Sequence, residues 1–295
     1  MHTGLAYALL AFGSWGLFPL YFALIATVPP LEVVLHRSVW SLLLVLGVLA
    51  WQQRWAWLGQ TLRQPKRVAL FTVSAMLLAC NWLVYVLAVQ TGHVADASLG
   101  YFINPLVNVL LGVLVLRERL RPLQWMAVVV AAGGVLWLTW QGGRLPWIAL
   151  VLAGSFGLYG LIRKTAPLGA LEGLALENLL LAPLAVPALL WWSFARDGVL
   201  LTGPASQIGW LLLSGPLTAL PLLWFAGAAR RLKLATLGLV QYIAPTLQLA
   251  LAVWVFHEPF DGARLVGFVM IWSALALVSA DALGWRPGDG RARTS

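Results

Sequence analysis

Hydrogen-bonding side chains interrupt two otherwise apolar stretches of this sequence. In the first stretch, Tyr101, Asn104 and Asn108 follow one another at spacings of three and four residues, so in a helix they would share one face. In the second stretch, Gln241 and Gln248 are seven residues apart and would also share a face. Amides and phenols can bind the polar groups of a small molecule, but inside a membrane they also join helices to each other. The polar side chains of the two stretches could therefore form a binding site, or they could join neighbouring helices.

Further polar and aromatic residues lie in other apolar stretches of the chain. Ser74, Asn81 and Tyr85, for example, have the spacing of a single helix face. For any one such residue helix packing is the favoured interpretation, whereas the whole set favours a cavity, because amides and aromatic rings come from both halves of the chain. The candidate lining residues outside the first two stretches are Trp15, Tyr21, Arg37, Asn81, Tyr85, Ser155 and Tyr159.

Two charged residues, Arg37 and Glu177, fall within expected membrane spans. Each lies roughly 9 Å deep, counting six residues into its helix at about 1.5 Å per residue. Because the two helices enter from opposite faces of a core ~30 Å thick, the side chains would differ in depth by ~12 Å, and we do not expect them to pair directly. Arg37 could attract an anionic group such as a carboxylate. Glu177 is a candidate carrier of a coupling proton.

Asp96 is a second candidate for proton coupling, at the outer end of an expected helix. Its position in the first turn offers a plainer role, because acids there complement the helix dipole. The second half of the chain has Leu234 at the matching place, and this asymmetry keeps a ligand role open for Asp96.

Each of the two amide-bearing stretches contains a proline, Pro105 in the first and Pro245 in the second. A proline inside a helix removes one backbone hydrogen bond and clashes with the preceding turn. In a membrane the freed carbonyl must be satisfied by protein, water or a ligand. Both prolines are therefore predicted to kink their helices, either as hinges or as fixed bends that shape the bundle.

The composition shows what kind of protein must position these residues. Of the 295 residues, 61% are hydrophobic and only 10% are charged, whereas a soluble domain carries about a quarter charged residues. Apolar runs near 20 residues recur along the whole chain, which is typical of transmembrane helices. The sequence therefore predicts an all-α polytopic membrane protein. We expect ten transmembrane helices, at about 4–26, 31–51, 67–90, 94–116, 122–140, 145–163, 170–193, 207–229, 234–256 and 263–283.

The 19 arginines and lysines are distributed unevenly between the two sides of this topology. If the N-terminus is cytoplasmic, only Arg144, Arg196 and Arg264 fall in outer loops and only Arg37 falls in a span. Cytoplasmic loops of membrane proteins carry such an excess of basic residues. The sequence therefore predicts a multi-pass protein of the bacterial cytoplasmic (inner) membrane with both termini in the cytoplasm, and an even number of spans.

An internal repeat of about 140 residues divides the chain into two halves, 1–141 and 142–295. Pro105 corresponds to Pro245 and Glu118 to Glu258, and "GSWGLF" at 13–18 resembles "GSFGLY" at 154–159. Because each half contains five helices, the second half must cross the membrane in the opposite sense. Inverted repeats of this kind are typical of transporters that open a central site alternately to each side.

Several other classes of protein are not supported by the sequence. There is no phosphate-binding GxxxxGK[ST] motif and no GxSxG or HExxH, so we expect neither an ATP-driven pump nor an enzyme. Cys80 is the only cysteine and the histidines are scattered, so we expect no metal and no cofactor. The net charge of +9 lies in short loops and reports topology rather than nucleic-acid binding. The expected partners are a small-molecule substrate and the lipid bilayer, and we expect a monomer, with a dimer as the alternative.

Four segments of the sequence resemble the RarD group of EamA-type transporters, in the drug/metabolite transporter superfamily. The most specific is "SLGYFINPL" within Asn81–Val135, and the others are "WGLFPLYF" at 15–22, "VPPLEVVLHRSVWS" at 28–41 and "LENLLLAPLA" at 176–185. Gln90 and Asp96 stand where the group often has Asn and Glu. The resemblance implies ten helices in two inverted halves and the export or exchange of small metabolites or drugs. It supplies no established list of binding residues.

These observations predict a secondary active transporter for small organic solutes, working by alternating access through a central cavity. The alternative is a non-transporting sensor or scaffold, and a membrane-embedded enzyme comes third. A sensor should carry a signalling domain, which the short loops leave no room for, and a scaffold has no need of polar stripes in both halves. Substrate, direction and coupling ion are not determined by the sequence.

Overall fold

The computed structural model describes residues 2–91, 94–141, 147–257 and 262–282. Within these ranges the regular structure is entirely helical. Most helices are long and apolar, and two short ones, at Ala56–Leu62 and Val199–Thr202, lie where the sequence predicted loops. The elements are α1 (His2–Gly16), α2 (Phe18–Leu24), α3 (Pro30–Trp51), α4 (Ala56–Leu62), α5 (Pro65–Gln90), α6 (Val94–Leu114), α7 (Pro122–Gln141), α8 (Trp147–Thr165), α9 (Ala170–Ala195), α10 (Val199–Thr202), α11 (Ala205–Ala229), α12 (Leu234–Gln241), α13 (Ile243–Trp254) and α14 (Gly262–Ala282).

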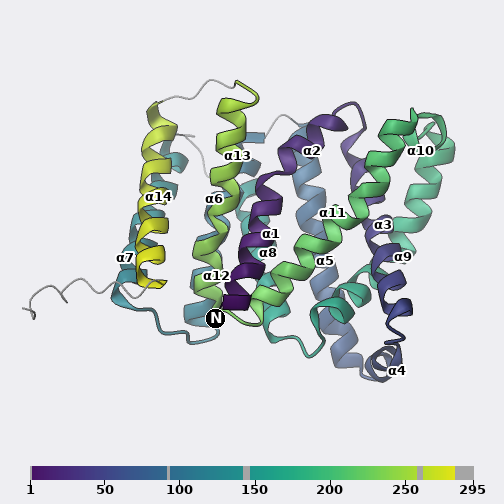
Figure 1. The fold of residues 1–295 in the computed structure, drawn as a ribbon, viewed down its shortest axis with the longest axis horizontal. Coiled ribbons are helices and arrows are strands. Elements are labelled where there is room, and N and C mark those ends of the chain that lie inside the picture. The colour runs from purple at the N-terminus through teal and green to yellow at the C-terminus, as the bar shows by residue number, and fades with distance from the viewer. Residues whose placement is uncertain (1, 92–93, 142–146, 258–261, 283–295) are drawn as a thin grey trace, which may run out of the picture.

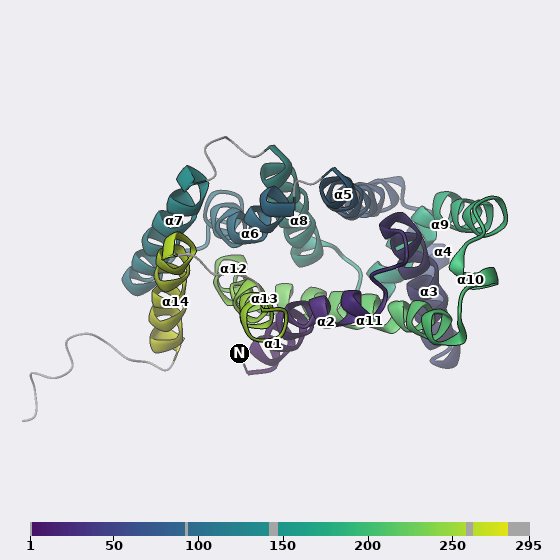
Figure 2. The ribbon, with the colours of Figure 1, turned by 90° about the horizontal axis from the view of Figure 1, so that it is seen from above.

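The long helices stand roughly side by side, with their axes across the long dimension of the molecule (Figure 1). Seen from above, α7 and α14 form a pair at one end and α3 and α9 lie toward the other (Figure 2). Between these ends, α5, α6 and α8 follow one long side, and α1, α2, α11 and α13 follow the other (Figure 2). Helices from the two halves of the sequence are therefore interleaved, and do not form two separate bundles.

Eight helical segments in the described ranges are long and apolar enough to cross a membrane. This confirms the prediction of an all-α, multi-pass membrane protein. The other two expected spans, 94–116 and 263–283, correspond to α6 and α14, whose apolar stretches are the shorter segments Leu99–Leu114 and Leu265–Ala274. A perpendicular span needs about 20 apolar residues, so the count of ten spans stays a prediction.

Prolines explain why two of the expected spans are broken into two helices. The first span divides at Leu17, just before Pro19 at the start of α2. The ninth divides at Tyr242, and Pro245 follows in the first turn of α13. At the start of a helix the missing N–H costs little, because it would have no partner there in any case. Pro105, by contrast, lies inside the continuous helix α6.

Small residues allow α6 to pack closely against helices of the second half. A Cβ at Gly238 in α12 would stand 2.5 Å from the carbonyl oxygen of Pro105, and one at Gly100 in α6 would stand 3.1 Å from that of Ala149 in α8. Both glycines therefore bring two backbones into contact, as small residues commonly do between membrane helices. They occupy the same place in the "SLG" and "TLG" segments of the repeat.

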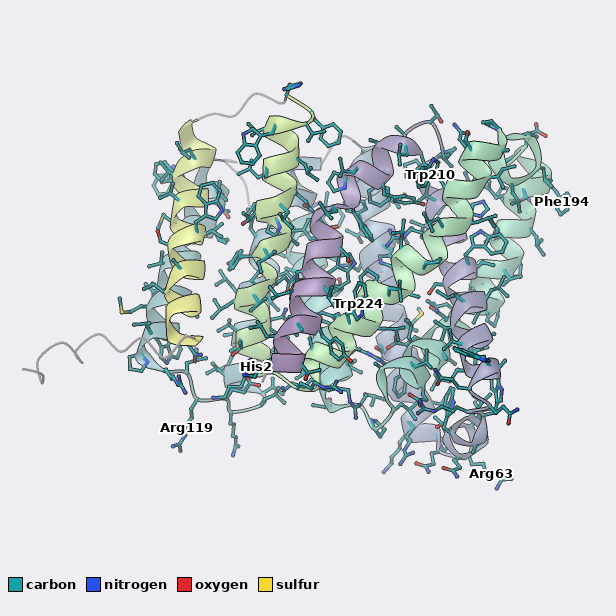
Figure 3. All side chains as sticks on the ribbon, viewed as in Figure 1. His2, Arg63, Arg119, Phe194, Trp210 and Trp224 are labelled. Atoms are coloured by element: carbon teal, nitrogen blue, oxygen red, sulfur yellow. The ribbon has the colours of Figure 1, made fainter. Side chains whose placement is uncertain are left out.

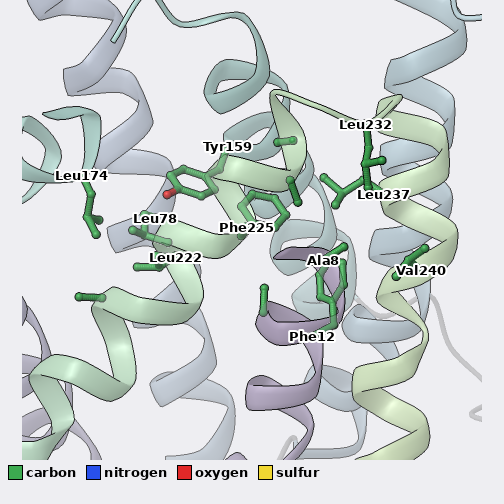
Figure 4. Packing of buried hydrophobic residues seen from close by; sticks show 14 of the residues in the cluster. Ala8, Phe12, Leu78, Tyr159, Leu174, Leu222, Phe225, Leu232, Leu237 and Val240 are labelled. Carbon is green, nitrogen blue, oxygen red and sulfur yellow. The ribbon is translucent and has the colours of Figure 1, made fainter. Parts of the chain in front are cut away.

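Aromatic rings fill the interior between α1, α8 and α11 (Figure 4). The rings of Tyr159 and Phe225 stack with centroids 5.9 Å apart, and Phe12 meets Phe225 edge-on at 6.1 Å. All three side chains are fully buried. On the outside, by contrast, large apolar side chains such as Leu114 and Leu136 are exposed, which is what a surface in contact with lipid requires.

Candidate functional site

A cavity of about 180 Å³ lies among the helices of both halves. A single water needs roughly 10–15 Å³ of such space, so the cavity can hold a small organic molecule. No described residue of α7, α9 or α14 lines it. Nine of the predicted residues do, namely Trp15, Arg37, Asn81, Tyr85, Tyr101, Asn104, Gln241, Pro245 and Gln248.

A chain of three amides connects α6 to α12 beside the cavity. The Nδ2 group of Asn108 donates to Oδ1 of Asn104 at 3.2 Å and to Oε1 of Gln241 at 2.9 Å. Asn104 and Gln241 line the cavity, whereas Asn108 is fully buried behind them. Asn108 thus fixes the orientation of two amides that face the cavity, and the two polar stripes predicted from the sequence meet here.

Arg37 reaches the cavity from α3. Its Nε group donates to the hydroxyl oxygen of Thr218 in α11 at 2.9 Å. Its Cζ atom lies over the rings of Phe18, Phe22 and Trp82, at 5.6, 5.8 and 5.3 Å from their centroids. These distances allow cation–π attraction. No acidic side chain forms an ion pair with Arg37 among the described residues.

Aromatic side chains form much of the remaining wall. Tyr85 and Tyr101 meet edge-on with centroids 6.2 Å apart. Trp15 and Phe156 meet in the same way at 5.5 Å. Edge-to-face contacts of this kind are favourable between rings, so these side chains hold one another in place around the cavity.

The prolines also affect the backbone of three cavity residues. Pro19, Pro105 and Pro245 each follow a lining residue by four positions, and those residues are Trp15, Tyr101 and Gln241. Because proline has no N–H, none of the three carbonyls receives the usual helical hydrogen bond. The carbonyl of Trp15 is satisfied instead by the Nε2 group of Gln248, at 3.0 Å. A polar side chain of the cavity wall thus satisfies a carbonyl that a proline leaves without its helical hydrogen bond.

Asn81 combines packing with a place in the wall. Its Nδ2 group donates to the carbonyl of Leu152 at 2.9 Å and to the hydroxyl of Ser155 at 3.0 Å, both in α8. Asn81 lines the cavity, but Ser155 does not. The Nδ2 hydrogens of Asn81 are therefore engaged by α8, and its carbonyl oxygen is the atom left for a ligand.

Five other predicted site residues lie outside the lining of this cavity, and they are Tyr21, Pro105, Asn108, Ser155 and Tyr159. The hydroxyl of Tyr21 donates to the carbonyl of Trp210 at 3.1 Å and so joins α2 to α11. Tyr159 belongs to the packed interior described above. The side chain of Asp96 lies outside the described residues, as do Glu258 and the side chain of Gln90.

Glu177 lies outside the cavity lining, in a separate and fully buried polar cluster. It accepts a hydrogen bond from Ser74 at 2.6 Å and one from Tyr159 at 3.5 Å, and it pairs with Arg163 at 3.5 Å. Gly173 leaves room for this arginine, because a Cβ there would overlap its Nη1 atom. Arg37 and Glu177 therefore have different partners, in agreement with the depth argument from the sequence.

Sequence reasoning missed several residues of these two sites. Phe18 and Phe22 share a helix face, and a search for aromatic stripes would have found them. Thr218 has no such signal, because a single threonine in an apolar run is usually bonded to its own helix. Arg163 precedes Lys164 near a helix end and was assigned with it to the cytoplasmic loop, although it is only 2% exposed.

No group of three or more His, Cys, Asp or Glu side chains in the described ranges could hold a metal ion. The cavity offers amides, hydroxyls, aromatic rings and one guanidinium. These groups can bind a small organic molecule. An all-helical membrane protein with such a cavity between its helices has the architecture of a solute transporter.

Comparisons with known proteins give the family. Residues 2–140 match the EamA-like transporter family. An uncharacterised transporter of Pseudomonas aeruginosa is 47% identical over 97% of this chain and 95% of its own length. The protein RarD of Streptomyces exfoliatus is 44% identical over 95% and 89%, and that of Escherichia coli is 41% identical over 95% of each chain. The chain therefore belongs to the EamA-like transporter family as a RarD-type member of the drug/metabolite transporter superfamily.

A solved crystal structure has the same fold. It superposes with a TM-score of 0.68 at 21% sequence identity and covers 95% of this chain and 98% of the other. At this identity the likeness supports the arrangement of the helices alone.

Proposed function

We propose that this protein is a secondary active transporter that moves a small organic solute across the membrane by alternating access. The observation that carries the proposal is the cavity, which lies among helices of both halves and is lined by amides, aromatic rings and Arg37. Transporter sites of this kind lie near the membrane midplane between repeated halves. Family membership supports transport as the activity and gives no support to catalysis.

The contacts between helices support two inverted five-helix repeats. In the repeat, α5 corresponds to α11, α3 to α9, and α1 to α8. Two contacts therefore occur once in each arrangement of the halves. The contact of α3 with α11 corresponds to that of α9 with α5, and the contact of α1 with α11 corresponds to that of α8 with α5. Three further contacts, α6 with α12, α7 with α14 and α3 with α9, join a helix to its own counterpart. A two-fold axis between the halves generates this pattern.

The distribution of charged side chains supports cytoplasmic termini in an inner membrane. His2, Arg63 and Arg119 lie at one end of the molecule, and Phe194 and Trp210 lie toward the other (Figure 3). An end rich in arginine is the one that faces the cytoplasm in multi-pass proteins. We therefore place the start of α1 on the cytoplasmic side.

On that side, charged groups link helices of both halves and would close the cavity toward the cytoplasm. The carboxylate of Glu118, after α6, accepts hydrogen bonds from the backbone N–H groups of Leu234 and Ala235 at 2.8 and 3.0 Å. It also pairs with Lys164 at 3.6 Å. In the cycle we propose, these contacts break when the cavity opens inward, and Pro105 and Pro245 lie where α6 and the α12–α13 pair could bend.

We further propose that transport is coupled to the movement of protons through Glu177 or Asp96. Glu177 is an intramembrane carboxylate, and such groups often serve proton movement. We expect Glu177→Gln to abolish uptake driven by a pH gradient while leaving exchange of labelled for unlabelled solute intact. If gradient-driven uptake persists in this variant, Glu177 is not the coupling group.

The transport activity itself can be tested in liposomes. The purified protein would be reconstituted and screened for uptake of labelled metabolites and drugs, with and without a pH gradient. We expect flux for at least one class of solute, and weaker flux in Asn104→Leu and Gln241→Leu variants that insert normally. Phe194→Leu, on the exposed surface, is the control. Absence of flux for every solute class would favour the sensor or scaffold alternative.

A further inference from the structure

The guanidinium of Arg37 has unused hydrogen-bond donors. An arginine carries five N–H groups, and the one on Nε is taken by Thr218. The four on Nη1 and Nη2 make no hydrogen bond with any described residue, and Arg37 is only partly buried. These donors are in a planar arrangement that matches a carboxylate.

The surroundings of Arg37 favour an anion over a cation. Among the described residues that line the cavity, it is the only charged one. The buried acids elsewhere are engaged, since Glu177 pairs with Arg163, and Glu32 accepts a hydrogen bond from the backbone N–H of Val199 at 2.6 Å. Among the residues that the structure describes, no acid is therefore paired with Arg37, and an unneutralised guanidinium repels an ammonium group.

The rings beside Arg37 indicate the rest of the ligand. Phe18, Phe22 and Trp82 surround the guanidinium, and Trp15 with Phe156 adds a further apolar wall. An apolar or aromatic body would displace water from these faces. A single guanidinium matches one negative charge, whereas phosphate esters with two charges usually require several basic groups.

We infer that Arg37 makes this cavity selective for small monocarboxylates with an apolar or aromatic body. The inference rests on the proposed function, because it names the substrate class of the same cavity. The amides of Asn104 and Gln241 would then bind neutral polar groups of the ligand, and Thr218 holds the guanidinium in place.

The test compares matched ligands on the purified protein in nanodiscs. Benzoate, phenylacetate and indole-3-acetate are each compared with the corresponding carboxamide and with benzylamine, phenethylamine and tryptamine. Binding is measured from the ligand-dependent rise in melting temperature. At least one carboxylate should bind about tenfold or more tightly than its carboxamide, and the amines should not bind.

Variants test whether the preference for carboxylates depends on Arg37. Arg37→Gln should remove it, Arg37→Lys should keep part of it, and Arg196→Gln, which removes an exposed arginine after α9, should leave it unchanged. Thr218→Val should weaken carboxylate binding a few-fold, and it serves as the second variant if Arg37→Gln fails to fold. The inference is overturned if no carboxylate is preferred over its carboxamide, or if the preference survives in Arg37→Gln.

Flux in liposomes separates this inference from the proposed function. Equal transport of a carboxylate and its carboxamide would support the transport function and refute the selectivity for carboxylates. Selective binding of carboxylates without flux of any compound would support the selectivity and refute the transport function.

Discussion

Arg37 and Arg163 are both buried to some degree among apolar helices, yet their partners differ. Arg163 is 2% exposed, pairs with the carboxylate of Glu177 at 3.5 Å and donates to the carbonyl of Ala170 at 2.9 Å. Arg37 has a threonine and three aromatic rings around it and faces a cavity. A buried charge is costly unless it is paired. The charge of Arg163 is thus paired within the protein, whereas in our proposal the guanidinium of Arg37 is paired by a ligand.

The largest expected effect is on stability, at Arg163. Arg163→Met should lower the free energy of unfolding by about 3–5 kcal/mol, because it leaves the Glu177 carboxylate buried without its partner. Arg37→Met should lower it by only about 1–2 kcal/mol, the combined scale of its cation–π contacts and its one hydrogen bond. Thermal unfolding in detergent would compare the two variants.

The double variant Arg163→Met, Glu177→Leu sharpens this comparison. Removing both charges should recover most of the lost stability, because replacing a whole buried pair by apolar residues is often neutral. Equal losses in Arg163→Met and Arg37→Met would contradict the distinction between a paired and an available arginine.

A smaller effect is expected at Ser74, the neutral partner of Glu177. Ser74→Ala removes a hydrogen bond of 2.6 Å to a buried carboxylate, which should cost about 1.5–3 kcal/mol. Solute flux per folded molecule should be unchanged if the cluster is purely structural. A large loss of gradient-driven flux without loss of stability would instead place Ser74 in the coupling pathway.

The smallest effect on stability is expected at Thr218, the neutral partner of Arg37. Thr218 is itself buried, but the guanidinium that it binds is partly exposed and can bind water instead. Thr218→Val keeps the shape of the side chain, so the loss of this one hydrogen bond should cost about 1 kcal/mol or less. The substitution should raise the KM for the transported solute, because the guanidinium loses the hydrogen bond that holds it in place. An unchanged KM with a large loss of stability would assign Arg37 to packing.

The sequence was sufficient for the class of fold and for much of the cavity. Apolar runs near 20 residues identified the membrane helices, and the spacing of Asn104 and Asn108 placed them on one face. The repeat paired this stretch with the one that contains Gln241, but the hydrogen bond between Asn108 and Gln241 was found only in the structure. These features depend on composition and helical periodicity, which a sequence records directly.

Partners between helices could not be predicted in the same way. Arg163 and Glu177 lie on consecutive helices, α8 and α9, but whether they face one another depends on how each helix is rotated. The break at Leu17 was also missed, although Pro19 is visible in the sequence, because a proline can bend a membrane helix without dividing it. Pro105 in the continuous helix α6 shows that second outcome.

Alternating access through this cavity has one direct test, the reactivity of a single cysteine from each side of the membrane. Cys80→Ser removes the only native cysteine, and Asn104→Cys then places a thiol on the cavity wall. Asn108→Cys, one turn away on α6 and fully buried, is the matched control. We predict that a membrane-impermeant thiol reagent labels position 104 both in right-side-out and in inverted vesicles, and labels position 108 in neither. Labelling of position 104 from one side only, in every condition tried, would contradict the account.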